Sequence, residues 1–295
     1  MKRTIRSVAR FAVAVAAVIG VDAAAGAWTV TVDAGAVYDD NLTRAAARSD
    51  RRDDSALAGG IGVGYAWLPT GYDSLALVVD ARGGAYDRYP GLDFASIGAT
   101  VRYRRKLALG IDAPWVAVSA TAGYTDYRDD VRDGSTLRLH AALGRRFDET
   151  LAVNVGIGHD RRHARSDVPL VPGVSGAIFE LAGSSLDASV EYALDPRWQA
   201  SGRTSARRGD VESTSRRNRA VFVASTAIAD DPAFRDPELF GYRLRGTTLS
   251  AAVSLSYAPH DRASLNVGYL HESTRASEGI RYRSRAVEAT VVYGF

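Results

Sequence analysis

The sequence predicts an all-β fold: a transmembrane, antiparallel, up-and-down β-barrel of about twelve strands, preceded by a cleavable signal peptide. Three observations support this prediction. The chain begins with a segment typical of secretion signals, most of the remaining sequence alternates apolar with small or polar residues, and its connections alternate between short turns and long charged loops. The predicted boundaries are 1–27 for the signal peptide and 28–295 for the barrel.

Residues 1–27 have the three parts of a secretory signal peptide. A cationic start precedes the apolar stretch Phe11–Val21, and either Ala23-Ala24-Ala25 or Ala25-Gly26-Ala27 offers a cleavage site. The apolar stretch is about half as long as a membrane-spanning helix requires, which excludes a helical membrane protein. The four basic residues and one acid of residues 1–25 account for the whole formal net charge of +3. The mature chain is therefore neutral, and no nucleic acid is expected as a partner.

The chain contains no cysteine. This excludes disulfide frameworks, thiolate metal centres, iron–sulfur clusters and thiol catalysis. We expect no metal site and no cofactor.

Alternation with a period of two residues predicts the strands. Apolar residues occupy every second position from Trp28 to Ala36, and again from Val287 to Phe295. The twelve alternating segments are 28–36, 57–67, 75–84, 97–104, 116–125, 136–146, 151–158, 186–192, 198–207, 249–257, 265–269 and 287–295.

The connections between these segments fall into two classes. The short turns lie near 69–71, 109–112, 148–149, 195–197 and 259–261. The long, charged loops are 39–54, 87–92, 128–134, 160–177, 209–242 and 274–280. Short turns on one side and long loops on the other are typical of bacterial outer-membrane barrels. Aromatic residues beside the short turns are expected at the lipid–water boundary: Tyr65, Trp67, Tyr72, Trp115, Phe147, Tyr192, Trp198 and Tyr257.

Loop 209–242 has a centre, Ala220–Ile228, that itself looks like a strand. A spanning strand here would put the later hairpins on the wrong sides of the membrane. We therefore expect 209–242 to be a long extracellular loop, either an extended hairpin or a plug that folds inward.

A soluble β-sandwich would also alternate. The signal peptide, the strand length, the loop asymmetry and the terminal Phe295 favour a membrane barrel instead. In lipid every backbone N–H and C=O must be paired, so the sheet has to close.

The C-terminus, Val291-Val292-Tyr293-Gly294-Phe295, resembles the terminal signal that the barrel assembly machinery of Gram-negative bacteria reads. On this resemblance, Val291, Tyr293 and Phe295 are assembly-signal residues. It places the protein in the bacterial outer membrane, with outer-membrane lipid and lipopolysaccharide as its surroundings.

The opening segment contains Tyr38-Asp39-Asp40-Asn41 and is similar to the first strands of the barrel domains of exopolysaccharide exporters and surface-lipoprotein assembly modifiers. Arg207–Val211 and Tyr242-Arg243-Leu244 are similar to parts of uncharacterised barrels related to these. The exporters and modifiers carry a periplasmic helical-repeat domain, for which 295 residues leave no room.

The polar face of the alternating segments predicts the lining of a lumen. The candidates for lumen lining and selectivity are Arg82, Arg102, Arg104, Arg138, His140, Arg146, Arg203, Arg207, Asp80 and Glu191. Rings of charged side chains select ions in pores, and an excess of arginine predicts a small anionic solute as cargo. The alternative is a lattice of cross-strand salt bridges that fills and stiffens the barrel.

Two other patterns contain residue types that occur in catalytic or metal sites. His271 and Ser273 would share the lipid-facing side of one strand, as the histidine and serine of some outer-membrane lipases do, but no residue that orients the histidine is identifiable. The segment His159–His163 contains two histidines and one acid beside two arginines, which is a poor site for a cation. No catalytic residue is expected.

The sequence therefore predicts a porin-like transport barrel that is not an enzyme: a narrow pore, or a transport-associated structural barrel. The alternatives are an accessory barrel for the export of surface polysaccharide or lipoprotein, and an outer-membrane lipid hydrolase.

Overall fold

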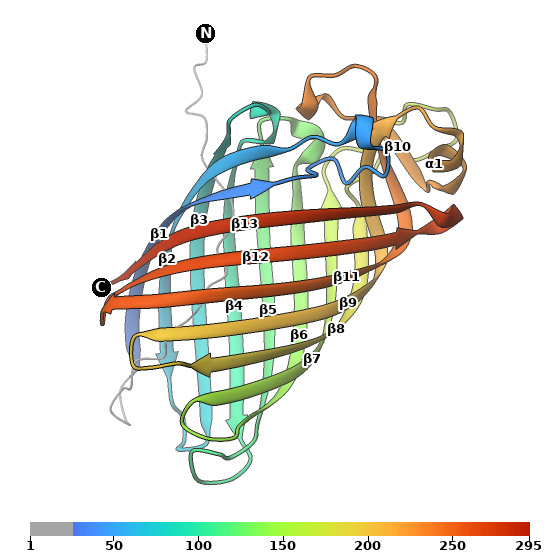
Figure 1. Cartoon of the computed structure of the whole chain (residues 1–295). Coiled ribbons are helices and arrows are strands. Elements are labelled where there is room, and N and C mark those ends of the chain that lie inside the picture. Colours follow the sequence, from blue (N-terminus) through green and yellow to red (C-terminus); the bar gives the residue numbers. More distant parts are fainter. Residues whose placement is uncertain (1–25) are drawn as a thin grey trace.

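The computed structural model describes residues 26–295, which form a closed antiparallel β-barrel (Figure 1). Within these residues twelve strands make the wall. They are β1 (Ala27–Asp39), β2 (Asp54–Trp67), β3 (Asp73–Tyr86), β4 (Phe94–Lys106), β5 (Trp115–Tyr127), β6 (Gly134–Arg146), β7 (Leu151–Ala164), β8 (Leu181–Ala193), β9 (Trp198–Arg216), β11 (Leu239–His260), β12 (Ala263–Ala276) and β13 (Arg281–Gly294). The predicted twelve-stranded barrel is confirmed. The signal peptide proposed for 1–27 lies, except for its last two residues, outside the described residues.

The barrel closes between its first and last strands. Each wall strand pairs with the next one along the chain, and β13 pairs with β1 in a register that joins Thr31 to Gly294. A last hydrogen bond runs from the N–H of Phe295 to the carbonyl oxygen of Val30, at 2.9 Å. The candidate assembly-signal side chains, Val291, Tyr293 and Phe295, are all exposed beside this seam.

The outer face of the wall is apolar. Exposed side chains such as Ile61, Val101 and Ile157 occupy alternate positions of their strands. Aromatic pairs lie on this face near the short turns, with ring centroids 4.9 Å apart for Trp28 and Tyr65 and 4.6 Å apart for Trp198 and Tyr257. Such an outer surface suits contact with lipid bounded by an aromatic girdle.

The two ends of the barrel are built differently. The short-turn end carries the turns 68–72, 107–114, 147–150, 194–197 and 261–262. The long-loop end carries 40–53, 87–93, 128–133, 165–180, 217–238 and 277–280. Two loops differ from the prediction because their strands run further than the alternation shows: β7 continues to Ala164 and β9 to Arg216.

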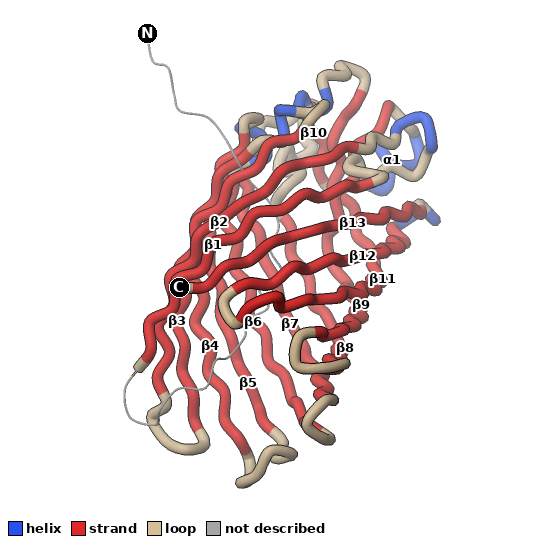
Figure 2. The backbone as a smooth tube through the Cα atoms, turned by 60° about the vertical axis from the view of Figure 1, so that its left-hand side comes forward, coloured by secondary structure: helices blue, strands red, loops and turns tan. Residues whose placement is uncertain are grey.

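Helical turns occur only at the long-loop end of the described chain (Figure 2). They are α1 (Arg219–Ala224) and the single 3₁₀ turns η1 (Arg48–Asp50), η2 (Pro90–Leu92), η3 (Asp130–Arg132), η4 (Pro232–Phe234) and η5 (Ser277–Gly279). None of the helices in residues 26–295 is long and apolar enough to cross a membrane.

The strand-like segment Ala220–Ile228 is mostly helical, contrary to its sequence pattern. Asn218 caps α1 by accepting hydrogen bonds from the N–H groups of Ala220 and Val221, and the short β10 (Ala227–Asp230) follows. β10 pairs with the first residues of β11, Phe240–Arg243, which lie before β11 joins the ladder with β12. It therefore does not count as a spanning strand.

The buried apolar residues gather at the long-loop end. Three clusters combine residues of 211–244 with residues of the neighbouring loops, including Leu92, Phe179 and Ile280. The apolar core of this protein thus lies across the barrel end and not along its axis.

Candidate functional site

Strand register defines the inner face of the wall. Paired residues point to the same side of a sheet, and one continuous set runs from Asp33 through Gly60 to Arg82. The same face continues to Thr100 and Thr121, whose hydroxyl groups are hydrogen bonded at 3.0 Å. The exposed apolar side chains lie on the opposite face, so this set lines the lumen.

All ten candidate lumen residues lie on this inner face by register. The pairs that place them are Arg82 with Gly60, Asp80 with Gly62, Arg102 with Ser119, Arg104 with Ala117, Arg138 with Asp160, His140 with Gly158, Arg146 with Ala152, Glu191 with Ser201, Arg203 with Ser189 and Arg207 with Ser185. Their roles in selectivity remain a proposal.

One group of these residues is paired with acids. Arg82 binds Asp33, and Arg207 binds Asp160 at 2.7 Å. Asp187 accepts from both sides: His140 Nε2 lies 2.9 Å from one carboxylate oxygen, and Arg203 lies 3.4 Å from the other. Ion pairs between strands are therefore present inside the barrel, although they do not include every lumen arginine.

A second group has no acid partner. Within the described residues Arg102, Arg104, Arg138 and Arg146 form no ion pair. The charges of Arg146, Arg102 and Glu191 all act on Arg104, whose guanidinium lies 4.0 Å from the ring centroid of Trp115. This arginine cluster, defined as Arg102, Arg104 and Arg146, lies toward the short-turn end.

Trp115 corrects the prediction of an outer aromatic girdle. It pairs with Lys106 and Gly144, residues of the inner face, and it is buried. Its position beside a short turn resembles that of Trp198, but the period-two pattern puts it on the opposite side. The arginine stacked on it explains an aromatic ring inside the lumen.

The lumen near the short-turn end is accessible to water. Arg102 and Arg146 face inward and are nevertheless exposed, as is Glu191.

The long-loop end is covered by an extension of the wall. The ladder of β9 with β8 ends at Gly209, that of β11 with β12 ends at Gly246, and these two glycines pair with each other. Beyond them β9 and β11 continue as a two-stranded ribbon that carries α1, β10 and η4. We call residues 210–245 the lid.

The two glycines are required where the ribbon leaves the wall. A Cβ on Gly209 would collide with the backbone of Ala182 and Gly183, and one on Gly246 would lie 3.0 Å from the carbonyl oxygen of Arg275. The backbone ladder between β8 and β9 ends here, and the Asp210 side chain accepts a hydrogen bond from the N–H of Ala182 at 3.0 Å in its place.

The lid contacts every other long loop of the barrel end. On one side Thr214 N–H donates to the carbonyl of Thr43, and Ala233 packs against Gly91. On the other side the N–H of Ile228 donates to Ser175, and Val221 packs with Ile280. The fifth contact is the ion pair between Arg132 and Asp231. An element that reaches loops all around a closed ring lies across its opening.

The pair of Arg132 and Asp231 fastens the lid. Arg132 donates from Nε at 3.2 Å and from Nη2 at 2.6 Å to the two carboxylate oxygens, and both side chains are buried. Thr214 adds a 2.6 Å hydrogen bond to the same carboxylate, and the guanidinium lies 4.6 Å from the ring centroid of Phe179. No sequence pattern singles out Arg132, because it lies in a charged loop that is expected to be solvated.

Two carboxyl groups of the same loop resist ionisation. Burial, together with the charge of Asp231, raises the pKa of Asp129 to about 6. Burial, together with the charges of Asp126 and Asp130, raises the pKa of Asp133 to about 6. Asp129 Oδ2 is buried without a hydrogen-bond partner.

The remaining chemical candidates are dispersed. His271 and Ser273 pair with residues of the outer face, including Leu249, and no hydrogen bond joins them within the described structure. The segment His159–His163 belongs to β7, where His163 binds Glu180 at 2.8 Å. In residues 26–295 no group of three or more histidine or acidic residues is arranged to hold a metal ion.

Comparison with known proteins supports the fold. No protein-family model matches the chain, and comparison with curated proteins finds no match. Among solved structures, an outer membrane channel from Pseudomonas putida F1 has a TM-score of 0.58 at 12% identity, covering 96% of this chain and 100% of that one. The NanC porin has a TM-score of 0.48 at 9% identity and 89% and 98% coverage. The outer membrane channel DcaP of Acinetobacter baumannii has a TM-score of 0.46 at 10% identity and 92% and 97% coverage. The more specific resemblance to exporters and lipoprotein assembly modifiers stays a prediction.

Proposed function

We propose that this protein is an outer-membrane pore for small anionic solutes, with a lid at its extracellular mouth. The observation that carries the proposal is the arginine cluster: three inward-facing cations without ion pairs, in the water-accessible half of a closed barrel. A cation left unpaired in a narrow lumen favours anions, because the low-dielectric wall strengthens its field.

The location rests on the outer surface. A belt of exposed Val, Ile and Leu side chains with aromatic pairs at its edge is costly in water and suits lipid. The short-turn end then faces the periplasm, and the lid faces outward.

Arginine fits this task better than lysine. Its planar guanidinium stays charged and can bind a carboxylate or phosphate through two hydrogen bonds. The ring of Trp115 fixes the orientation of Arg104, so the cation is presented to the lumen in one place.

Planar-bilayer recording under a salt gradient tests the proposal. We expect a permeability ratio of chloride over potassium above 1 in the parent, falling to about 1 when Arg102, Arg104 and Arg146 are all replaced by Gln. Arg105→Gln is the matched control, because Arg105 neighbours Arg104 but faces outward, where it binds Asp73 at 3.4 Å. An unchanged ratio in the triple variant would refute the role of the cluster.

A further inference from the structure

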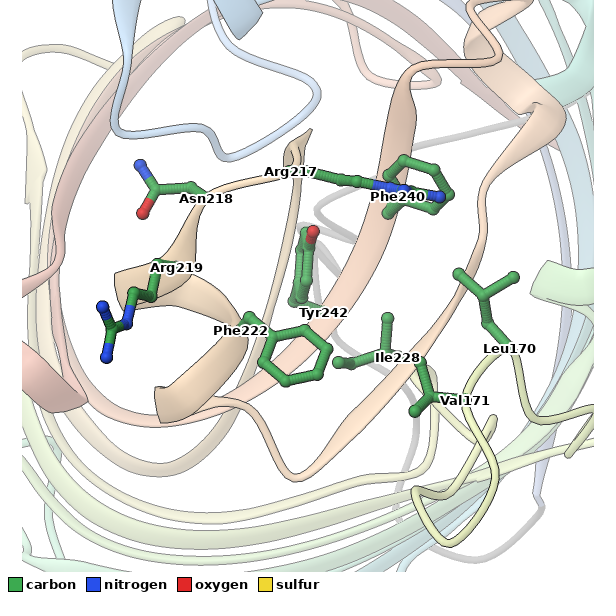
Figure 3. Close-up of a pocket in the computed structure, with 9 residues that line it drawn as sticks. All are labelled: Leu170, Val171, Arg217, Asn218, Arg219, Phe222, Ile228, Phe240 and Tyr242. Atoms are coloured by element: carbon green, nitrogen blue, oxygen red, sulfur yellow. The ribbon is translucent and has the colours of Figure 1, made fainter.

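The lid contains a small pocket that the pore proposal does not use. Its volume is about 410 Å³, within the range of small-molecule sites. Figure 3 shows its lining side chains gathered around one space inside the ring of wall strands. They come from four parts of the chain: the β7–β8 loop, the connection from β9 to α1, α1 itself, and the paired strands β10 and β11.

The walls of this lid pocket are apolar. Leu170, Ile228, Phe240 and Tyr242 line it together with Phe222, which projects from α1. The Phe222 side chain is 45% exposed, although it lies at the long-loop end, where the other large apolar side chains of the clusters are buried. An exposed aromatic ring in a concave site is a surface that an apolar ligand can cover.

The charged residues of the lid pocket are all basic. Arg217 lies over the ring of Phe240, 4.9 Å from its centroid, whereas the guanidinium of Arg219 points away from the pocket (Figure 3). Neither forms an ion pair with another described residue, whereas the adjacent Arg216 binds Asp50, Asp236 and Glu238. Since no acid lines the pocket, the positive charge of Arg217 is left for a ligand.

From this combination we infer that the lid pocket binds organic anions that carry a carboxylate on an apolar body. The apolar body covers Phe222 and Ile228, and the carboxylate pairs with Arg217. An inorganic anion lacks the apolar contact, and a neutral aromatic molecule lacks the ion pair. The role of the pocket, capture of cargo ahead of the lumen, rests on the pore proposal; the binding itself does not.

Calorimetric titration of the full-length protein in lipid nanodiscs tests the binding, with empty nanodiscs as the blank. The probes are benzoate, its neutral counterpart benzamide, and sodium sulfate. We expect saturable binding of benzoate only. A charge-assisted hydrogen bond is worth about tenfold in affinity, so Arg217→Gln should raise the dissociation constant of benzoate by about that factor. Arg219→Gln should raise it less, because the guanidinium of Arg219 points away from the pocket.

Two control variants separate the pocket from the rest of the lid. Phe222→Ser should weaken benzoate binding, while Val223→Ser should not, because Val223 is its exposed neighbour on α1 and does not line the pocket. Arg245→Gln removes an exposed cation outside the pocket and should leave binding unchanged.

The outcomes distinguish the two proposals. Equal binding of benzoate and benzamide, or equal loss in Phe222→Ser and Val223→Ser, overturns the carboxylate site whatever the conductance. Selective benzoate binding to a chain that never conducts supports the site and refutes the pore.

Discussion

The two ends of the barrel differ in the burial and ion pairing of their charged side chains. At the long-loop end Arg132 and Asp231 are buried and fully paired within an apolar core. At the short-turn end the arginine cluster faces water without acid partners. Buried charges must be paired to be tolerated, whereas charges in a wet lumen need not be. The buried ion pair belongs to the end that the lid covers, and the arginines without ion pairs belong to the end that water reaches.

Removing the lid should have the largest effect. Residues 210–245 can be replaced by Asn-Gly, because Gly209 and Gly246 already pair across the ribbon and a two-residue turn can join them. We expect single-channel conductance to rise by about tenfold, because the width of the pore is then set by the wall alone. Conductance equal to that of the parent would mean that the lumen is blocked elsewhere. Shortening the turn 107–114 is the control.

Breaking the fastening pair should loosen the lid without unfolding the barrel. Asp231→Asn leaves the Arg132 charge buried and unpaired, a loss of about 3–5 kcal/mol. Hydrogen exchange of residues 227–234 should accelerate, while that of the β3 and β4 ladders stays unchanged. Asp53→Asn breaks the exposed pair with Arg88 and should cost less than about 1 kcal/mol. Similar exchange in the two variants would contradict a special role for Asp231.

A change of pH should have a smaller effect on the stability of the closed lid. Burial, together with the charge of the lid residue Asp231, raises the pKa of Asp129 from its ordinary value of 3.8 to about 6. With the lid closed, Asp129 therefore binds an extra proton in this window, so the stability of the closed lid rises as pH falls from above 6 towards 4. Conductance should fall over the same range. Asp129→Asn, which mimics the protonated form, should flatten the pH dependence; a profile that keeps its full slope would exclude Asp129 as a contributor.

The wall could be predicted from sequence because each strand shows its own alternation of apolar and polar residues, independently of distant contacts. A strand between lipid and lumen alternates with period two, and a closed antiparallel barrel follows from strand count and loop asymmetry. The same alternation predicts that each lumen candidate, such as Arg104, lies on the inner face of the wall.

The lid could not be predicted in this way, because its structure depends on contacts between distant loops. Residues Ala220–Ile228 have the side chains of a strand, yet Asn218 caps a helix there and the apolar face packs against Ile280. Arg132 looks like a solvated loop residue until Asp231, 99 positions away, is placed beside it. The paired glycines Gly209 and Gly246 mark the boundary, but only the register of the ribbon shows that they face each other.

The seam between β1 and β13 has a consequence for biogenesis. These strands are neighbours in the sheet and lie at opposite ends of the described chain, joined in register from Thr31 with Gly294 to Asp39 with Ala286. Until β1 pairs with β13, the nascent sheet exposes two unpaired edges, and each edge can pair with another chain and aggregate. Closure is a contact of maximal sequence separation, the kind that forms slowly. A chain that lacked β13 would keep every hairpin from β1 to β12, and both edges of its sheet would stay unpaired in the membrane.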